Sequence, residues 1–275
     1  MTRWLDPQPV DVSPLSHLDL PPLVAQTLLR RGISRPDDVE AFLHPEKSTS
    51  TQFPEIERAV EYINLTIRKE ERICVWGDFD VDGQTSTALL VQTLGALGAD
   101  VVYYIPVRGR ESHGVHIESL KPIIDNGAKL LLTCDTGITA HEAIDYANSR
   151  GVDVIITDHH DIGETLPNAK AIINPKLLPE DHPLRNLAGV GVAYKLAESL
   201  LRSNDFSRSQ PATEVATTSE SLLDLVALGL IADVALLQGE TRSLAQKGIR
   251  QLRQTNRLGL KVMAELSNTN LDALT

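Results

Sequence analysis

The sequence between residues 73 and 83 reads Ile73-Cys74-Val75-Trp76-Gly77-Asp78-Phe79-Asp80-Val81-Asp82-Gly83. An apolar run typical of a buried strand leads directly into three carboxylates at alternate positions, and a glycine follows them. Carboxylates this close repel one another, and the apolar run supplies no neutralising partner. Hard divalent cations take oxygen ligands of this kind. The stretch therefore predicts a bound cation at the end of a strand.

Strand-like and helix-like segments alternate on both sides of this stretch. The expected strands are 73–76, 101–105, 129–133 and 152–157, with a short fifth strand at 171–173. The expected helices are 56–70, 85–97, 116–125, 140–149, 187–201, 222–230 and 244–252, with short helices between 20 and 44 and a polar loop at 203–220. Continuous apolar strands separated by helices indicate a parallel sheet covered on both faces. The predicted fold class is α/β, with a short helical segment at the N-terminus.

Composition narrows the class of protein. The chain has 275 residues, of which 42% are hydrophobic and 23% charged, as in ordinary globular proteins. No apolar run approaches the roughly 20 residues that span a bilayer, and the first residues lack the apolar stretch of a signal peptide. Cys74 and Cys134 lie in strand-like segments and are expected to be buried thiols. These features predict a cytoplasmic protein without a membrane partner.

The net charge of −11 argues against a broadly basic nucleic-acid-binding surface. One region near the C-terminus is an exception, because basic residues recur there at helical spacing: Arg242, Lys247, Arg250, Arg253, Arg257 and Lys261. The last five are expected near one helix face. Both a solvated helix face and a phosphate-contacting stripe fit this pattern.

Polar residues follow three of the expected strands. Functional residues of an open parallel sheet lie beyond the carboxyl ends of its strands. The residues found there are Asp78, Asp80 and Asp82 after the first strand, Asp135 after the third, and Asp158-His159-His160 after the fourth. Carboxylates with imidazoles suit manganese or magnesium, and zinc and iron also remain open. The donor set is too large for one catalytic ion, but it suits two ions that clamp the oxygens of a phosphoryl displacement.

Calcium binding by an EF-hand is the main rival for the first motif. Asp-x-Asp-x-Asp-Gly also opens an EF-hand loop, which needs a glutamate six residues after the glycine. That position is Leu89, and a strand rather than a helix precedes the motif. The EF-hand is therefore excluded.

These motifs resemble those of the DHH phosphoesterase superfamily, and within it the RecJ family of single-strand-specific exonucleases. The triad that gives the superfamily its name is Asp158-His159-His160, and its continuation through Gly163-Glu164-Thr165-Leu166-Pro167 to Asn174-Pro175 is typical of the RecJ family. Residues 77–83, 187–193 and 227–234 match three further motifs. The similarity extends from about residue 20 to 255.

The resemblance implies a metal site for two Mn²⁺ or Mg²⁺ ions. Asp80 and Asp135 would hold the first ion, and Asp135 would bridge to the second. Asp82, His159 and Asp233 would complete the second site. Asp78 is expected near the first ion, directly or through water.

The resemblance also implies which residues act on the substrate. His160 would contact the scissile phosphate, and Arg108 resembles a substrate-phosphate contact. Asp135, His159 and His160 would thus be the catalytic residues. Nothing in the residues themselves identifies Asp233, which in isolation reads as the end of a helix.

The chain departs from the family pattern at several positions. Trp76 stands where some members carry a histidine, Thr136 follows Asp135 where relatives have asparagine, and Glu111-Ser112-His113-Gly114 replaces the usual Glu-Gly-Tyr-Gly. The sequence also stops at Thr275, before the DHH-associated domain and the oligonucleotide-binding fold of RecJ proteins. We therefore expect metal binding to survive and processive hydrolysis to be weak.

The expected organisation is an N-terminal helical segment at 1–70 packed on the core, a catalytic domain at 71–255 and a helical linker at 256–275. The leading hypothesis is a metal-dependent 5′–3′ exonuclease of single-stranded DNA that acts in repair and recombination, with single-strand-binding or repair proteins as candidate partners. A second hypothesis is a phosphodiesterase of short oligonucleotides or cyclic dinucleotides. A third is a non-catalytic scaffold of DNA replication.

Overall fold

The computed structural model describes residues 7–44, 51–203 and 217–274. Contacts between Cα atoms divide the chain into two compact units, Met1–Thr49 and Ser50–Thr275. The first unit contains the 3-10 helix η1 (Ser13–Leu18) and the helices α1 (Pro22–Arg30) and α2 (Pro36–Leu43). A proline begins both α-helices, at a position where its missing amide hydrogen costs nothing. Leu15, Ala25, Leu28 and Val39 form a small apolar core. The short helices expected between residues 20 and 44 are confirmed.

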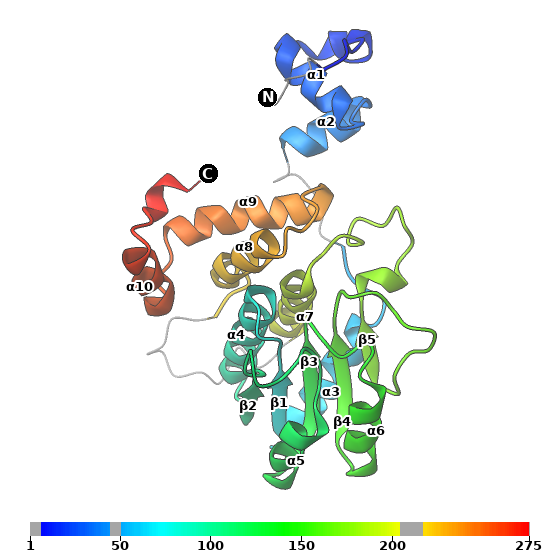
Figure 1. Cartoon of the computed structure of the whole chain (residues 1–275), viewed down its shortest axis with the longest axis vertical. Helices are drawn as coiled ribbons and strands as arrows, with labels where there is room; N and C mark the ends of the chain where they lie inside the picture. The colour runs from blue at the N-terminus through cyan, green and yellow to red at the C-terminus, as the bar shows by residue number, and fades with distance from the viewer. Residues whose placement is uncertain (1–6, 45–50, 204–216, 275) are drawn as a thin grey trace. The chain divides into compact units, whose positions relative to one another are not determined.

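A parallel five-stranded sheet forms the centre of the second unit (Figure 1). Its strands are β1 (Arg72–Trp76), β2 (Val101–Tyr104), β3 (Ala128–Cys134), β4 (Asp153–Thr157) and β5 (Ala171–Ile173). They lie side by side in the order β2-β1-β3-β4-β5, and all neighbouring pairs are parallel. All five expected strands and the α/β fold class are confirmed.

Helices cover both faces of this sheet, because side chains along each strand alternate between two apolar cores. Ile73 and Val75 of β1 pack into the core that contains α3 (Ile56–Arg68), α4 (Val81–Ala96), α7 (Gly189–Ser203) and α8 (Leu223–Ala232). Cys74 and Trp76 pack into the opposite core with α5 (Ile117–Asp125) and α6 (His141–Ser149). Strands buried on both faces explain why their sequences read as continuous apolar runs.

Helix α3 belongs with the sheet. Its buried residues Ile56, Val60, Ile63 and Ile67 follow a spacing of three and four, and they join the core under β1 and β3. The unit boundary at residues 49 and 50 therefore lies before α3, whereas the expected boundary followed it at residue 70.

Helix α4 begins four residues earlier than expected. Its N-cap is Asp80, whose side chain accepts a hydrogen bond from the amide of Gly83 at 2.9 Å. Side-chain oxygens at the N-cap commonly satisfy such free amides. The earlier start matters for the site, because Asp82 then lies in the first turn of α4 and Asp80 is the residue directly before the helix.

The remaining helices follow α7 in the chain. They are α8, α9 (Gly239–Arg253) and α10 (Leu258–Leu266), with the short 3-10 helices η5 (Glu220–Leu222) and η6 (Leu271–Ala273). A further 3-10 helix, η3 (Pro175–Leu177), precedes α7. The expected polar loop at 203–220 lies mostly outside the described residues. No helix in the described part of the chain combines the length and apolar character needed to cross a membrane.

The basic residues near the C-terminus do not share one helix face, so that expectation was wrong. Helix α9 ends at Arg253, and Arg257 lies at the N-cap of α10. There the guanidinium of Arg257 donates to the buried carboxylate of Asp224 at 2.9 Å and 3.0 Å. The helix break thus separates Arg257 and Lys261 from Lys247, Arg250 and Arg253.

Candidate metal centre

The sheet reverses its strand order beside β1. The chain leaves β1 for β2 on one side and returns to β3 on the other, so β1 and β3 become neighbours. In open α/β sheets such a reversal opens a crevice at the carboxyl ends of the two strands, where ligands bind. The predicted carboxylates after β1 and β3 lie at this point of the fold.

Asp82 is held by the first residues of α7. Its Oδ2 accepts from the amide of Gly189 at 2.7 Å, and its Oδ1 accepts from the amide of Val190 at 2.8 Å. Amides at a helix N-terminus favour an anion. Burial nevertheless dominates and, with the nearby charges of Asp233 and Asp80, raises the pKa of Asp82 to about 7. A bound cation would therefore favour the ionised form of this carboxyl group.

Asp78, the first carboxylate of the acidic motif, is buried and only 2% exposed. Its Oδ1 accepts from the amide of Phe79, and its Oδ2 lies 2.7 Å from Nδ1 of His113. Both oxygens thus have protein partners. Asp78 is not in either of the clusters of metal-binding side chains found among the described residues.

Asp135 occupies a strained position after β3. Its φ is +59°, in the left-handed region that aspartate tolerates better than most residues. Burial, followed by the charges of Asp82 and Asp80, raises the pKa of Asp135 far above its ordinary value. Its Oδ1 is buried and accepts no hydrogen bond from the described residues. A charged oxygen in this state is costly unless a cation neutralises it.

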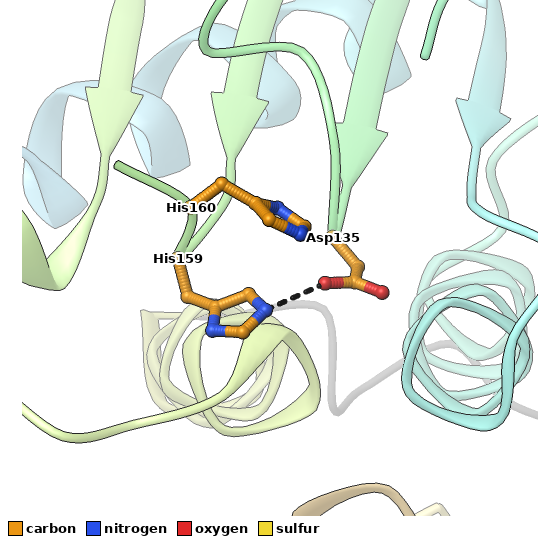
Figure 2. A group of neighbouring side chains, drawn as sticks. All are labelled: Asp135, His159 and His160. Atoms are coloured by element: carbon orange, nitrogen blue, oxygen red, sulfur yellow. Dashed lines mark ion pairs between the residues drawn. The ribbon is translucent and has the colours of Figure 1, made fainter. Parts of the chain in front are cut away.

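His159 stands opposite that oxygen (Figure 2). Its Nε2 is 3.0 Å from Oδ1 of Asp135 and 3.7 Å from Oδ2 of Asp82, while its Nδ1 is 4.0 Å from Oδ2 of Asp233. Burial, with the charge of His160, lowers the pKa of His159. The neutral imidazole, which is the form that binds metals, is therefore favoured at neutral pH.

His160 is fixed by Asp158. Its Nδ1 lies 2.7 Å from Oδ1 of Asp158, which also accepts from the amides of His159 and His160. Burial opposes ionisation of Asp158, but the bonds from His160 outweigh it and lower its pKa. The same bond raises the pKa of His160. Because Nδ1 is engaged, Nε2 is the nitrogen left for a ligand.

A pocket of about 440 Å³ opens beside this centre. Its lining residues are Phe79, Asp80, Val81, Asp82, Gln84, Arg108, Ala232 and Asp233. Arg108 is the only cationic side chain among them. The pocket is of a size that suits a small ligand.

The side chains form two clusters that fit divalent cations. Asp135, His159 and His160 form one, and Asp82, His159 and Asp233 form the other, with all ligand atoms of a cluster within 4.8 Å of one another. Carboxylate and imidazole donors suit Mn²⁺, and the oxygens suit Mg²⁺. The unpartnered Asp135 oxygen also fits a cation. Of the predicted site residues, these clusters and the pocket bring together all except Asp78.

Several residues that shape the site were not singled out from the sequence. Asp158 was recognised only as part of the triad, although it accepts a hydrogen bond from the imidazole of His160, two residues further on. Gly189 and Val190 were matched to a family motif, but their contact with Asp82 spans more than a hundred residues. Trp76 donates its indole N–H to the carbonyl of Gly114 at 3.1 Å and so supports the loop that carries His113.

Comparison with known proteins places this centre in a family. The model of the DHH family, N-terminal domain, matches residues 72–230, more than half of the chain. The chain belongs to the DHH family. The matched range of this DHH chain begins at β1 and ends in α8, so it contains every side chain of the two clusters except Asp233.

Individual relatives extend the comparison beyond that range. The DHH chain is 38% identical over 258 residues to the single-stranded-DNA-specific exonuclease RecJ of Bacillus subtilis, covering 93% of this chain and 31% of the relative. A crystal structure of exonuclease RecJ bound to manganese is similar with a TM-score of 0.68 at 36% identity, over 78% of this chain and 52% of that one.

A second solved structure is RecJ of Thermus thermophilus in complex with Mn²⁺. It matches with a TM-score of 0.73 at 31% identity, over 94% of this chain and 35% of that one. The DHH chain thus spans about a third to a half of the length of the relatives that it matches.

Proposed function

We propose that this chain is a two-metal phosphodiesterase that hydrolyses single-stranded DNA from its 5′ end. The observation that carries the proposal is the meeting of four side chains from separate segments, because Asp82, Asp135 and Asp233 all face the imidazole of His159. The Asp135 oxygen in this group is buried and accepts no hydrogen bond from the described residues. The similarity to RecJ exonucleases, including structures with bound manganese, supports the substrate and the metal.

The proposed metal ligands are those that the similarity to RecJ implies, and three of them, Asp82, His159 and Asp233, also form one of the two clusters. Asp80 and Asp135 would hold the first ion, with Asp78 close by, and Asp135 would be shared with a second ion held by Asp82, His159 and Asp233. Mn²⁺ or Mg²⁺ held there would supply a water of lowered pKa and positive charge for the phosphoryl oxygens. The amides of Gly189 and Val190 orient Asp82 for this task.

Two cationic side chains are proposed to contact the substrate phosphate. His160 presents Nε2, because Asp158 holds the hydrogen of Nδ1 and favours the imidazolium. This positive charge stabilises the phosphate as its oxygens gain negative charge. Arg108 is exposed at the pocket and offers the fork of N–H groups that suits a phosphate.

The size of the pocket favours a second candidate, hydrolysis of short oligonucleotides or cyclic dinucleotides. The pocket measures about 440 Å³ and contains one aromatic residue, Phe79. Long single strands are usually held by basic grooves and several stacking aromatics. A non-catalytic scaffold has less support, because its role would not require the buried donor set to be retained.

Hydrolysis of labelled DNA tests the proposal. The purified chain is incubated with Mn²⁺ and a single-stranded oligonucleotide labelled at either end, and Mn²⁺ binding is measured by calorimetry. We expect mononucleotides to appear first from the 5′ end. Asp135→Asn, which suits the left-handed backbone, should abolish hydrolysis and weaken Mn²⁺ binding. Asp145→Asn removes an exposed carboxylate of α6 and should change neither.

The outcomes separate the hypotheses. Manganese-dependent hydrolysis that persists in Asp135→Asn would overturn the proposed centre. Faster hydrolysis of a dinucleotide than of a long strand would favour the second candidate. Absence of Mn²⁺ binding in the unsubstituted chain would favour a scaffold.

A cytoplasmic location is also proposed, and the buried free thiols of Cys74 and Cys134 support it.

A further inference from the structure

The loop between β2 and α5 brings two side chains onto the ring of Phe79. The guanidinium carbon of Arg108 lies 4.5 Å from the centroid of that ring. The imidazole of His113 lies 4.1 Å from the same centroid at an interplanar angle of 47°. His113 belongs to the segment Glu111-Ser112-His113-Gly114, in which the chain departs from the RecJ pattern. The departure therefore lies next to the pocket that contains Arg108 and Phe79.

The backbone of this loop is fixed independently of that contact. The carboxylate of Glu111 accepts hydrogen bonds from the hydroxyls of Tyr104 and Ser119 and from the amide of Val107. The indole of Trp76 donates to the carbonyl of Gly114. These contacts anchor the loop on both sides of residues 112 and 113. Substitution of Phe79 or His113 should therefore leave the loop in place.

His113 links the ring of Phe79 to the buried carboxylate of Asp78. Its side chain is 66% exposed, yet its Nδ1 lies 2.7 Å from Oδ2 of Asp78. An ionised carboxylate only accepts hydrogen bonds, so Nδ1 is the donor. The other oxygen of Asp78 accepts from the amide of Phe79. Asp78 thus binds both residues of the ring contact, His113 through its imidazole and Phe79 through its backbone amide.

Within the described part of the chain, the guanidinium of Arg108 contacts this ring, and its backbone bridges to Glu111. An exposed arginine adopts many rotamers, and fixing it for a ligand costs side-chain entropy. A guanidinium over an aromatic ring is attracted by the negative face of that ring. The ring therefore reduces the number of positions that Arg108 samples before a phosphate binds.

We propose that Phe79 and His113 are positioning residues that hold the guanidinium of Arg108 over the pocket for a nucleotide phosphate. The proposal rests on the phosphate-contacting role of Arg108 proposed above. Asp78 fixes His113, His113 packs against the ring of Phe79, and the ring supports Arg108. The histidine at position 113 thus takes part in substrate binding without contacting the substrate.

A double-mutant cycle tests this arrangement. The Kd of a labelled single-stranded oligonucleotide is measured on the Asp135→Asn background, where hydrolysis does not interfere. Phe79→Leu keeps apolar volume but removes the ring face, and it should weaken binding about two- to fivefold. Phe79→Tyr should restore binding. On an Arg108→Ala background, Phe79→Leu should have no further effect, because the residue that it positions is absent.

Arg110→Ala provides the matched control cycle. Arg110 is an exposed cation of the same loop, and among the described residues it is Arg108 rather than Arg110 that lies over the ring of Phe79. Its effect on Kd and that of Phe79→Leu should multiply. His113→Ala should behave as Phe79→Leu does, and His113→Tyr, which introduces the residue usual in RecJ proteins, should restore binding. Made without Asp135→Asn, the variants Phe79→Leu, Arg108→Ala and Arg110→Ala should keep the melting temperature and Mn²⁺ affinity of the unsubstituted chain.

Three results would overturn the positioning role: no effect of Phe79→Leu, multiplication of its effect with that of Arg108→Ala, or a parallel loss of Mn²⁺ affinity. Hydrolysis by the unsubstituted chain separates this failure from failure of the proposed function. Coupling without any hydrolysis supports the positioning role and refutes the exonuclease. Hydrolysis without coupling refutes the positioning role alone. If Arg108→Ala does not change Kd, the phosphate contact and the positioning role both fall.

Discussion

Nε2 of His159 lies 3.0 Å from Oδ1 of Asp135 (Figure 2), and the two residues follow the carboxyl ends of the neighbouring strands β4 and β3. The Asp135 oxygen accepts no hydrogen bond from the described residues, and burial favours a neutral imidazole. Two electron-rich atoms that face each other in a buried site are stabilised when they share a cation. The parallel pairing of β3 and β4 thus brings together two side chains that suit a shared cation.

Metal binding should release protons. Burial raises the pKa of Asp82 to about 7 and that of Asp135 further, whereas both must be ionised to hold a cation. Calorimetry of Mn²⁺ binding in buffers of different ionisation enthalpy should show proton release at pH 6. The release should decrease as the pH rises through about 7, and Asp82→Asn should reduce it below that pH. Heats at pH 6 that do not depend on the buffer would contradict this prediction.

The same shift predicts how Asp82 affects stability without metal. The folded chain binds the proton of Asp82 more tightly than the unfolded chain, whose value is near 3.8. Its contribution to the free energy of unfolding therefore falls as the pH rises from about 4 to about 7. Urea unfolding of the metal-free chain should show a steeper fall over this range than unfolding of Asp82→Asn. Equal slopes would show that Asp82 does not carry the effect.

Asp158 and His160 should stabilise the fold in a defined pH window. The pKa of Asp158 is lowered and that of His160 is raised. The contribution of Asp158 is lost as the pH falls through its folded pKa, and that of His160 is lost as the pH rises through its own. In Asp158→Asn, NMR titration should give a lower pKa for His160. The titration should not change in Asp145→Asn, and an unchanged value in Asp158→Asn would refute the coupling.

The residues that the sequence predicted best are those that follow strands. Apolar runs mark β1, β3 and β4, and parallel strands place their carboxyl ends at one edge of the sheet, so Asp82, Asp135 and His159 were expected to meet. Local patterns are enough for this inference. The adjacency of β1 and β3, which brings the carboxylates close, comes from the strand order and has no local signal.

Contacts between distant segments explain what the sequence left open. Asp233 reads as a helix end, and it reaches the site because α8 packs closely against α4, where Gly229 lies beside Asp82 and Thr85. The spacing of the basic residues near the C-terminus suggested one helix face, but Arg257 forms an ion pair with the buried Asp224. Pairing of this kind is decided by tertiary packing and cannot be read from periodicity.

Val234, the residue after Asp233, should be a strained position. The amides of Val234 and Ala235 bond to the carbonyls of Ile231 and Leu230, as in a Schellman helix end, where glycine is usual. Val234 instead has a φ of +56° and is 87% exposed. Val234→Gly should therefore raise the free energy of unfolding by about 0.5–1 kcal/mol, since relief of strain exceeds the entropic cost of glycine.

Urea unfolding of two variants checks this prediction. Val262 is a partly exposed valine within α10, where the backbone is helical. Val262→Gly should lower the free energy of unfolding by roughly 0.5–1 kcal/mol, because glycine weakens a helix interior. If Val234→Gly is as destabilising as Val262→Gly, the left-handed conformation of Val234 carries no strain.

Gly189 should be essential to the metal centre, because its amide binds Asp82 and its Cα lies against Asp135. A Cβ at this position would fall 2.6 Å from both Cβ and Oδ1 of Asp135. Gly189→Ala must therefore displace Asp135 or the first turn of α7, and it should weaken Mn²⁺ binding about 10- to 100-fold. Calorimetric titration measures the loss of Mn²⁺ affinity.

Gly95→Ala in α4 is the control, since a Cβ there meets nothing within 4 Å. It should leave Mn²⁺ affinity unchanged and stabilise the chain by up to about 1 kcal/mol. Equal Mn²⁺ affinities in both variants would mean that close contact at Gly189 does not hold the two carboxylates in place.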